Sequence, residues 1–236
     1  MKTRNSSNKL KHLVIIPDGN RRWAKKHHFP SWHGHKRGAK RIKEIIEEVN
    51  QLNIPYLTFW IASKDNLEKR NRLEVNFLYK LFTNSFKQLT NSKSIHKNRV
   101  RVRILGEWRQ VVPKALNKTI CELIERTKTY NKFNLAFLLA YDGIGEMMQA
   151  FKDLIKQQSP EINYEIVKKS LLTSELPPVD LIIRTGGEPH NSAGFMMWHT
   201  AYSQYYFTST YFPDFDKKEL KKAINNYSKR ERRYGS

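Results

Sequence analysis

The 236-residue sequence is poor in cysteine and acidic residues and has no long apolar run. Its single cysteine, Cys121, excludes an intramolecular disulfide and fits a reducing compartment. No apolar run approaches the roughly 20 residues that a membrane-spanning helix needs. The polar opening MKTRNSSNKLK lacks the apolar centre of a secretory signal. These absences predict a soluble, cytoplasmic protein, and the length fits one α/β domain better than two small domains.

Several motifs that mark nucleotide- and metal-dependent enzymes are also missing. There is no G-x-x-x-x-G-K-[ST] loop and no G-x-G-x-x-G after a predicted strand, so neither a P-loop nucleotide hydrolase nor a dinucleotide enzyme is supported. The eight histidines lack H-E-x-x-H or Cys–His spacing, which argues against a zinc site.

Acidic residues are few relative to basic ones. The 22 Asp plus Glu against 43 Lys plus Arg give a formal net charge of +21. This surplus predicts anionic partners, whether nucleic acid, acidic lipid headgroups at the periphery of a membrane or small phosphorylated molecules. Nucleic acid is the weakest option, because the aromatic residues fall in predicted strands and not on an exposed stacking face. We therefore expect no nucleic-acid partner.

Apolar periodicity predicts strands that alternate with helices along the whole chain. Long connections between the strands imply a mainly parallel sheet covered by helices on both faces. We expect a single α/β domain over residues 11–236, preceded by a loose basic tail at 1–10. The predicted strands are 12–16, 55–62, 100–106, 133–140, 179–183 and 206–209, and the predicted helices are 34–52, 73–89, 113–129, 143–157, 164–172, 194–206 and 217–230.

The first candidate site follows the first strand. Residues 12–23, HLVIIPDGNRRW, combine a buried strand with a loop that carries one carboxylate, one glycine and two arginines. Asp18 is the hard oxygen ligand that Mg²⁺ prefers, and Gly19 lets backbone N–H groups approach an anion closely. Arg21 and Arg22 supply fork-shaped donors for phosphate oxygens. The loop is suited to a magnesium-bound phosphate group, although PDGN is also a good tight-turn sequence.

Two further strands are followed by clusters of polar residues. The run 63–66 (SKDN) comes after the strand at 55–62, and the run 184–192 (RTGGEPHNS) comes after the strand at 179–183. Each run alone also fits a capped helix start or a turn. Because the carboxyl ends of parallel strands lie on one edge of a sheet, all three ends are expected to line a single polar cleft.

Longer motifs are spread in order along the chain. They are IIPDGNRRWA at 15–24, GHKRG at 34–38, S-x-D-N at 63–66, VRILGE at 102–107, AYDG at 140–143, DLIIRTGGE at 180–188, W-x-x-AY at 198–202, and then YFT, FPDF and RERRYG. Together they resemble the cis-prenyltransferases, which comprise the undecaprenyl diphosphate synthase family and its short-chain relatives. The resemblance extends from about residue 11 to residue 235.

The resemblance implies a homodimer of six-stranded, mainly parallel sheets. It implies an enzyme that condenses isopentenyl diphosphate with an allylic diphosphate, with Mg²⁺ as cofactor, and that forms a Z double bond. Ile61 is bulky at a strand position where long-chain members tend to have a small residue, which favours a short product.

The resemblance also assigns roles to individual residues. Asp18 is implied as the catalytic aspartate that handles Mg²⁺ and the allylic diphosphate, and Asn66 and Ser63 as a polar pair near the reacting carbons. Arg184 and Ser192 match groups that hold the diphosphate of the isopentenyl unit, and Lys69 stands where an arginine is usual. The residues implied to bind substrate are Gly19, Asn20, Arg21, Arg22, Trp23, His35, Asp65, Lys69, Arg184, His190 and Ser192.

The sequence departs from the family pattern mainly near the isopentenyl site. Gln204 replaces a glutamate that helps to hold Mg²⁺, and a neutral amide is a weaker ligand for a hard cation. Pro189 and His190 replace a histidine and an arginine. Ser31 and Leu67 replace a common arginine and a common tryptophan. The allylic site is therefore expected to be largely intact and the isopentenyl site to be altered.

Breaking an allylic C–O bond leaves a carbocation-like centre and moves negative charge onto the departing diphosphate. The site must stabilise that charge and must keep the cation from water with an apolar wall. Core packing is the alternative role for the candidate wall residues. These candidates are Trp60, Ile61, Phe77, Leu81, Phe82, Phe137 and Leu139.

Three functions fit this sequence. The first is a short-chain cis-prenyltransferase. The second is irregular coupling that resembles the lavandulyl-type branch, in which two dimethylallyl diphosphates join. The third is a non-catalytic scaffold subunit of a prenyltransferase complex, against which the retained Asp18, Asn66 and loop arginines argue. Both enzymatic hypotheses require Asp18 and Arg184 to share one pocket.

Overall fold

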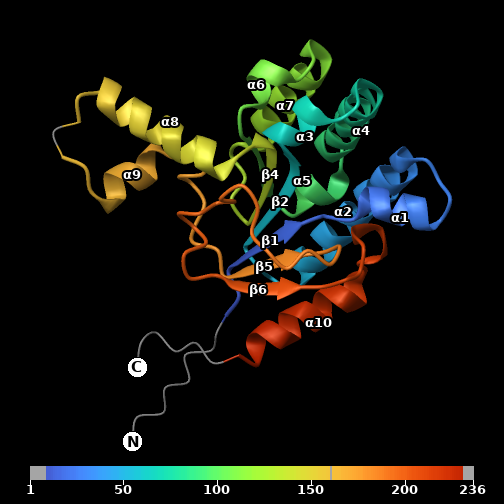
Figure 1. Ribbon diagram of the computed structural model, residues 1–236. Helices are drawn as coiled ribbons and strands as arrows, with labels where there is room; N and C mark the ends of the chain where they lie inside the picture. The colour runs from blue at the N-terminus through green and yellow to red at the C-terminus, as the bar shows by residue number, and fades with distance from the viewer. Residues whose placement is uncertain (1–8, 160, 231–236) are drawn as a thin grey trace, which may run out of the picture.

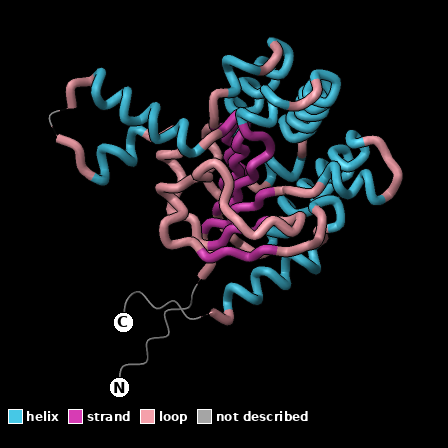
Figure 2. The backbone as a smooth tube through the Cα atoms, in the orientation of Figure 1, coloured by secondary structure: helices cyan, strands magenta, loops and turns pink. Residues whose placement is uncertain are grey.

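The computed structural model describes residues 9–159 and 161–230, which form a single α/β domain around a six-stranded sheet (Figures 1 and 2). Every strand pairing is parallel, and the strand order is β3-β4-β2-β1-β5-β6. The predicted fold class is confirmed. The strands are β1 His12–Ile16, β2 Tyr56–Ser63, β3 Val100–Leu105, β4 Phe133–Tyr141, β5 Leu181–Arg184 and β6 Gln204–Phe207.

Helices connect the strands. The helices α2, α4, α7, α8, α9 and α10 match the predicted ranges, whereas the short helices α1, α3, α5 and α6, with 4 to 7 residues each, were not predicted. The helices are α1 Asn20–Lys26, α2 Ser31–Gln51, α3 Lys64–Lys69, α4 Arg72–Thr90, α5 Lys93–Lys97, α6 Trp108–Val111, α7 Lys114–Thr127, α8 Gly143–Lys156, α9 Tyr164–Ser170 and α10 Lys217–Ser228, with the 3-10 helix η1 at Phe212–Asp214.

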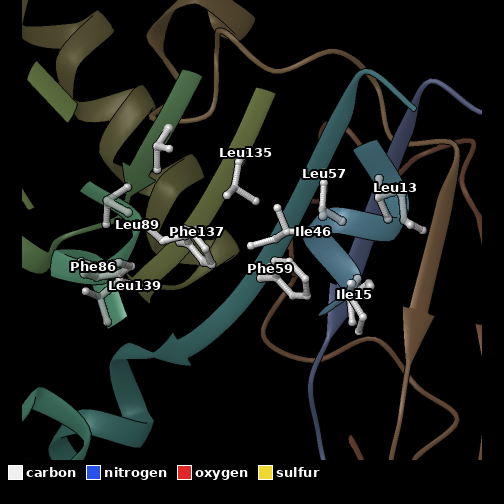
Figure 3. Packing of buried hydrophobic residues seen from close by; sticks show 14 of the residues in the cluster. Leu13, Ile15, Ile46, Leu57, Phe59, Phe86, Leu89, Leu135, Phe137 and Leu139 are labelled. Atoms are coloured by element: carbon white, nitrogen blue, oxygen red, sulfur yellow. The ribbon is translucent and has the colours of Figure 1, made fainter. Parts of the chain in front are cut away.

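The larger core lies between one face of the sheet and the helices that cover it. Side chains of the central strands, such as Leu13, Phe59 and Phe137, are almost fully buried there (Figure 3). Apolar faces of α2, α4, α7 and α10 complete this core. Burial of contiguous apolar surface is the main driving force for folding, so this core fixes the sheet that carries the loops.

The opposite face of the sheet is covered largely by irregular chain. Phe195 and Met196 pack there against Val14 and Leu138. A helix was predicted over 194–206, and this prediction is wrong, because residues 193–199 form successive turns before β6 begins. Gly194 and Met196 have φ angles of 58° and 45°, which a right-handed helix does not allow.

Helices α8 and α9 project from the sheet as an arm (Figure 1). The described part of the chain contains no helix that is long and apolar enough to cross a membrane. Of the expected basic tail, residues 1–8 lie outside the described residues. Leu10 is buried in the core, one residue before the expected domain boundary at residue 11.

The order of the strands brings the three predicted polar loops together. Strand β1 lies between β2 and β5, with Ile15 opposite Phe59 and Ile16 opposite Arg184. The loops that follow these three strands therefore leave the same edge of the sheet side by side, as a ligand site in an open parallel sheet requires.

Candidate active site

The backbone of the first loop is held from two directions. The carbonyl oxygen of Asp18 accepts hydrogen bonds from the Thr185 hydroxyl at 2.7 Å and the Phe212 amide at 3.1 Å. Gly19 has φ 98°, and a Cβ at this position would lie 2.6 Å from the ring of Tyr211. Glycine is required here both for its left-handed conformation and for this close approach.

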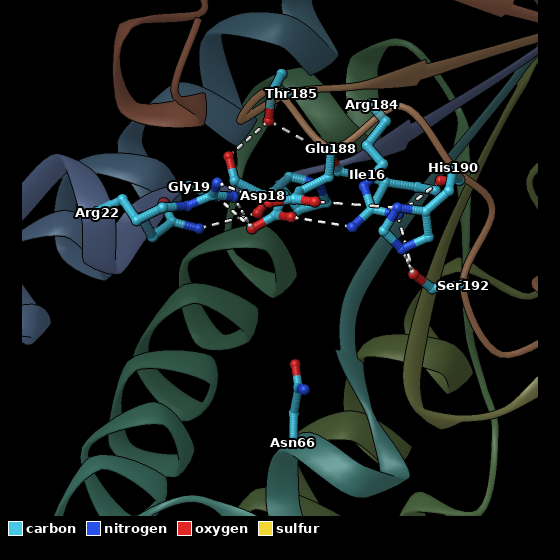
Figure 4. Close-up of polar contacts among 12 residues, drawn as sticks. Ile16, Asp18, Gly19, Arg22, Asn66, Arg184, Thr185, Glu188, His190 and Ser192 are labelled. Carbon is cyan, nitrogen blue, oxygen red and sulfur yellow. Dashed lines mark hydrogen bonds and ion pairs between the residues drawn. The ribbon is translucent and has the colours of Figure 1, made fainter. Parts of the chain in front are cut away.

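The carboxylate of Asp18 lies between two arginines (Figure 4). Its Oδ2 is 3.2 Å from Nη2 of Arg184, and its Oδ1 is 3.2 Å from Nη2 of Arg22. Arg22 also pairs with Glu188 at 3.1 Å. Asp18 and Arg184 thus share one pocket although 166 positions separate them in the sequence, as both enzymatic hypotheses require.

Arg184 is clamped on its other side by the loop that follows β5. Its Nη1 donates to the His190 carbonyl oxygen at 2.7 Å and to Ser192 Oγ at 2.9 Å, and the side chain is only 8% exposed. The His190 ring nitrogen Nε2 lies 3.0 Å from the same hydroxyl. These contacts fix the guanidinium in the orientation that faces Asp18.

A buried hydrogen-bond network holds the turns behind this loop. Glu146 accepts from the Tyr141 hydroxyl at 2.6 Å and from the amide and hydroxyl of Thr173 at 2.8 Å each. Burial lowers the pKa of His199 to about 4, and its Nε2 lies 2.9 Å from the Thr173 hydroxyl, which itself donates to Glu146. The Tyr141 oxygen accepts the Met196 amide at 3.2 Å. A fully satisfied buried network of this kind rigidifies the segment that carries Ser192.

The end of β2 supplies the opposite wall of the site. Ser63 caps α3 by accepting a hydrogen bond from the Asn66 amide at 3.0 Å. The run 63–66 therefore does form a capped helix start. The Asn66 side-chain oxygen accepts from Nη2 of Arg70 at 2.8 Å. Its Nδ2 has no hydrogen bond among the described residues, and the side chain lies across a gap from Asp18 (Figure 4). Asn66 is thus oriented to donate hydrogen bonds to a ligand.

Arg70 pairs with a second, half-buried carboxylate. Glu74 Oε1 is 3.2 Å from Nη1 of Arg70 and 3.1 Å from Nε2 of His35. Burial lowers the pKa of Arg70 and of His35, and Glu74 opposes both shifts. Glu74 therefore holds two cationic or donor side chains beside the pocket.

These elements enclose a cavity of about 750 Å³ with chemically different ends. Four arginines line one end together with Asp18 and Asn66. Aliphatic and aromatic side chains of α2, α4, β2 and β4 line the other. The arginines are Arg21, Arg22, Arg70 and Arg184, and the apolar residues include Ile42, Ile46, Trp60, Ile61, Leu78, Leu81, Phe82, Phe86, Leu89 and Phe137.

Most residues implied by the resemblance line this cavity. Trp23 and His190 do not. Trp23 is a buried residue of α1, and its Nε1 donates to Asp214 at 2.8 Å. Of the expected apolar wall, Phe77 and Leu139 also lie outside the lining. The predicted residues that line the cavity are Asp18, Gly19, Asn20, Arg21, Arg22, His35, Ser63, Asp65, Asn66, Arg184 and Ser192.

The structure places Arg70 in the cavity and the predicted Lys69 outside it. Lys69 was aligned with the arginine of the family, yet its side chain is 74% exposed and pairs with Asp65 at 2.6 Å outside the lining. The neighbouring Arg70 enters the cavity instead. The motif spacing could not reveal this, because α3 ends at Lys69 and the backbone of Arg70 is extended.

Gln204 lies at the other end of the sheet. It begins β6 opposite Leu181, the first residue of β5, whereas Arg184 ends that strand. Its side-chain oxygen accepts from Arg230 at 3.4 Å, and it does not line the cavity. Within one chain, the amide of Gln204 is not part of the Asp18 site.

The site fits a divalent cation that is shared with a bound ligand. Asp18 is 33% exposed and faces the cavity. The described residues contain no group of three or more His, Cys, Asp or Glu side chains that could enclose a metal. Mg²⁺ is commonly held by one or two carboxylates together with substrate phosphates. Asp18 and a diphosphate would form such a site.

The two ends of the cavity define the class of ligand. Four guanidinium groups and an amide donor suit a diphosphate, and the apolar end suits a hydrocarbon chain. The site is therefore that of an α/β protein that binds an amphiphilic diphosphate.

Comparisons with known proteins identify the family. A family profile described as "Putative undecaprenyl diphosphate synthase" matches residues 16–235. The chain is 39% identical over 231 residues to the "Tritrans,polycis-undecaprenyl-diphosphate synthase (geranylgeranyl-diphosphate specific)" of Pyrococcus horikoshii, covering 95% of this chain and 86% of that protein. It is 39% identical over 226 residues to an isoprenyl transferase of Rickettsia felis, covering 96% and 94%. The chain belongs to the undecaprenyl diphosphate synthase family of prenyltransferases.

A solved structure agrees with this assignment. The lavandulyl diphosphate synthase of Lavandula x intermedia, determined in complex with dimethylallyl diphosphate, superposes with a TM-score of 0.89 at 26% identity, covering 97% of this chain and 99% of that one. The predicted family and fold are therefore confirmed.

We predict that Arg70, and not Lys69, contributes to anion binding. Arg70→Gln should weaken the binding of inorganic pyrophosphate about tenfold, because a charge-assisted hydrogen bond to a diphosphate is lost. The matched variant Lys69→Gln should bind as the wild type does. Isothermal titration calorimetry measures both affinities, and thermal denaturation checks folding. Equal losses in the two variants would contradict this assignment.

Proposed function

We propose that the protein transfers a prenyl group from a short allylic diphosphate to isopentenyl diphosphate and forms a short product with a new Z double bond. The observation that carries this proposal is the pairing of Asp18 with Arg22 and Arg184 at the mouth of a cavity whose far end is apolar. The names of the relatives support the transfer of prenyl groups, whereas the short product is proposed from the lining of the cavity.

The arginines account for the departure of diphosphate. When the allylic C–O bond breaks, its electron pair leaves with the diphosphate, and the negative charge there increases. Arg21, Arg22 and Arg70 surround the space beside Asp18, and their charges are in place before the reaction. Donors that are fixed in advance stabilise developing charge without a reorganisation cost. Asn66 Nδ2 adds a neutral donor on the opposite side.

The second diphosphate is assigned to Arg184 and Ser192. Its isopentenyl double bond attacks the allylic carbon, and loss of a proton from the adjacent carbon restores a double bond. Trp60 and Phe137 line the cavity around the hydrocarbon chain and would exclude water from the cationic centre. Trp60 is itself supported by Phe195, whose ring centroid is 4.8 Å away.

We propose Mg²⁺ as the cofactor, held by Asp18 and diphosphate oxygens. It would supply positive charge at the leaving group. The two arginines already paired with Asp18 keep this carboxylate at the cavity mouth. We also propose a cytoplasmic location, which the single cysteine supports.

Irregular coupling of two dimethylallyl diphosphates is the second candidate function. The structural similarity to lavandulyl diphosphate synthase, with its TM-score of 0.89, favours it. So does the changed loop at Pro189 and His190, since the His190 carbonyl contacts Arg184 of the second diphosphate site. The cavity geometry alone suits either pair of substrates.

The length of the product is proposed from Ile61. This side chain is one of the apolar residues that line the cavity. A branched residue there occupies volume that a longer hydrocarbon chain would need, which supports a short product.

A homodimer is proposed from the surface of the arm. Four exposed apolar residues recur along one stripe of α8, namely Ile144, Met148, Phe151 and Ile155. Contiguous exposed apolar surface usually marks an interface. A second copy of the chain can cover this stripe with its own arm in a two-fold arrangement.

For Asp18→Ala we predict the loss of catalysis with the fold retained. Turnover of allylic and isopentenyl diphosphates should fall about a thousandfold, because metal binding and the alignment of both arginines are lost together. Asp18→Asn should behave similarly, since it keeps the shape but not the charge. Release of pyrophosphate measures turnover, and circular dichroism measures folding. An unchanged rate would remove the mechanism, and a wild-type protein that turns over no allylic substrate would favour the scaffold alternative.

The two candidate reactions can be distinguished by the substrates that the wild-type protein consumes. We expect wild-type protein with Mg²⁺ to form a short Z product from dimethylallyl and isopentenyl diphosphates together, and none from dimethylallyl diphosphate alone. Mass spectrometry after dephosphorylation identifies the product and its chain length. A branched or cyclic ten-carbon product from dimethylallyl diphosphate alone would establish irregular coupling instead.

For the dimer we predict that Phe151→Glu combined with Ile155→Glu shifts the protein from dimer to monomer, because charge is placed in an apolar interface. Leu73→Glu is a matched control, as Leu73 is an exposed leucine outside the arm. Analytical ultracentrifugation measures the mass. A wild-type monomer at micromolar concentration, or dissociation by the control as well, would contradict the proposed interface.

A further inference from the structure

The basic charge is concentrated around the first two helices. Residues 19–43 contain nine Lys or Arg, four His and no Asp or Glu. Arg21, Arg22 and His35 face the cavity and are explained by diphosphate binding. Lys25, Lys26 and other cations of this segment are exposed and do not line the cavity. Their excess remains to be explained.

The turn between α1 and α2 also exposes aromatic rings. Phe29 is 48% exposed and Trp32 is 49% exposed. Phe29 stacks on His33 with ring centroids 5.1 Å apart and on His27 at 6.5 Å, and Trp32 lies 6.4 Å from His33. We call residues 27–33 the aromatic tip. It protrudes at the edge of the molecule beyond α1 and α2 (Figure 1).

The aromatic tip is held rigidly. Helices α1 and α2 approach so closely that a Cβ on Gly34 would lie 2.0 Å from the carbonyl oxygen of Asn20. At the base of the tip, Trp23 is fixed by its hydrogen bond to Asp214 and by the Arg37 guanidinium, which lies 5.2 Å from its ring centroid. Phe29 and Trp32 are therefore presented to solvent by a fixed scaffold, and folding of the chain leaves them uncovered.

The chemistry of the tip selects one kind of partner. Tryptophan and phenylalanine insert at the boundary between lipid headgroups and acyl chains, and flanking Lys and Arg are attracted to anionic headgroups. Lys25 and Lys26 precede the exposed rings, and Lys36 follows them. Charge and apolar area therefore occur together on one protruding surface, with no acidic residue nearby in the sequence to repel the headgroups.

We propose that the aromatic tip docks the protein on an anionic phospholipid surface. This proposal rests on the proposed function, since a prenyl diphosphate product gives the membrane contact its purpose. The tip is also close to the cavity mouth, which α1 and α2 line through Arg22 and Gly38. A membrane held at the tip lies beside the opening from which an amphiphilic prenyl diphosphate leaves. Vesicle binding itself requires no turnover, so the two proposals can fail separately.

The test is cosedimentation of the full chain with vesicles of phosphatidylglycerol and phosphatidylcholine, without substrate. Phe29→Ser combined with Trp32→Ser should lower the partition coefficient at least about tenfold, since two aromatic side chains no longer leave water. The matched control is Leu52→Ser, because Leu52 is an exposed apolar residue at the other end of α2. The control should bind as the wild type does. Circular dichroism and turnover should be unchanged in both variants.

A second pair of variants tests whether vesicle binding depends on the charge beside the aromatic tip or on the net positive charge of the whole protein. Lys25→Gln with Lys26→Gln should weaken vesicle binding severalfold and reduce its salt dependence. Lys218→Gln with Lys222→Gln removes the same charge from α10 and should have a smaller effect. Pure phosphatidylcholine vesicles should bind weakly.

Three outcomes would overturn the proposal. The first is vesicle binding by the Phe29 and Trp32 double variant at the wild-type level. The second is an equal loss of vesicle binding in the two lysine double variants. The third is a wild-type protein that binds duplex DNA through these residues and does not bind vesicles. In each case turnover by the wild type would leave the proposed enzymatic function intact.

Discussion

The ion pair between Asp18 and Arg184 is the contact on which the site depends. It joins the loops after β1 and β5, which are neighbours in the sheet with Ile16 opposite Arg184. The parallel register thus brings together two residues that lie far apart in the sequence. A half-buried carboxylate beside a buried guanidinium is stable only when both are held by further partners. The Gly19 amide supplies one for the Asp18 carboxylate, and the His190 carbonyl supplies one for Arg184. Much of the surrounding loop structure therefore serves to keep two charges together.

The cavity that contains this ion pair has a charged end and an apolar end. Its arginine-rich mouth matches a diphosphate, whereas Phe82 and Phe137 line the opposite end. A reaction through a carbocation-like state needs both surroundings within one enclosure, because the leaving group must be stabilised and the cation must be kept from water. The sheet provides the first through its strand ends, and the helices α2 and α4 provide the second. Neither layer would suffice without the other.

The sequence predicted those features of the site that follow from strand patterns. The apolar runs before Asp18, Ser63 and Arg184 indicated strands, and the edge rule for parallel sheets then brought their loops together. It did not predict α1, which has seven residues and no side-chain cap, nor the inward turn of Arg70 after α3. The aromatic-rich segment 194–206 predicted a helix, whereas the structure has turns at 193–199. Their conformation is imposed by tertiary contacts, such as that of the Met196 amide with Tyr141, which local sequence does not encode.

The two proposed surfaces lie on different parts of the molecule, and this separation has a functional meaning. The arm of α8 and α9 projects on one side of the sheet, and the turn between α1 and α2 lies on the other (Figure 1). A dimer that forms through the arms would therefore leave both aromatic tips uncovered. Two tips that reach one surface at the same time bind it with a higher effective affinity than either alone, because the second contact is intramolecular. Dimer formation would thus strengthen membrane contact without any additional residue at the tip.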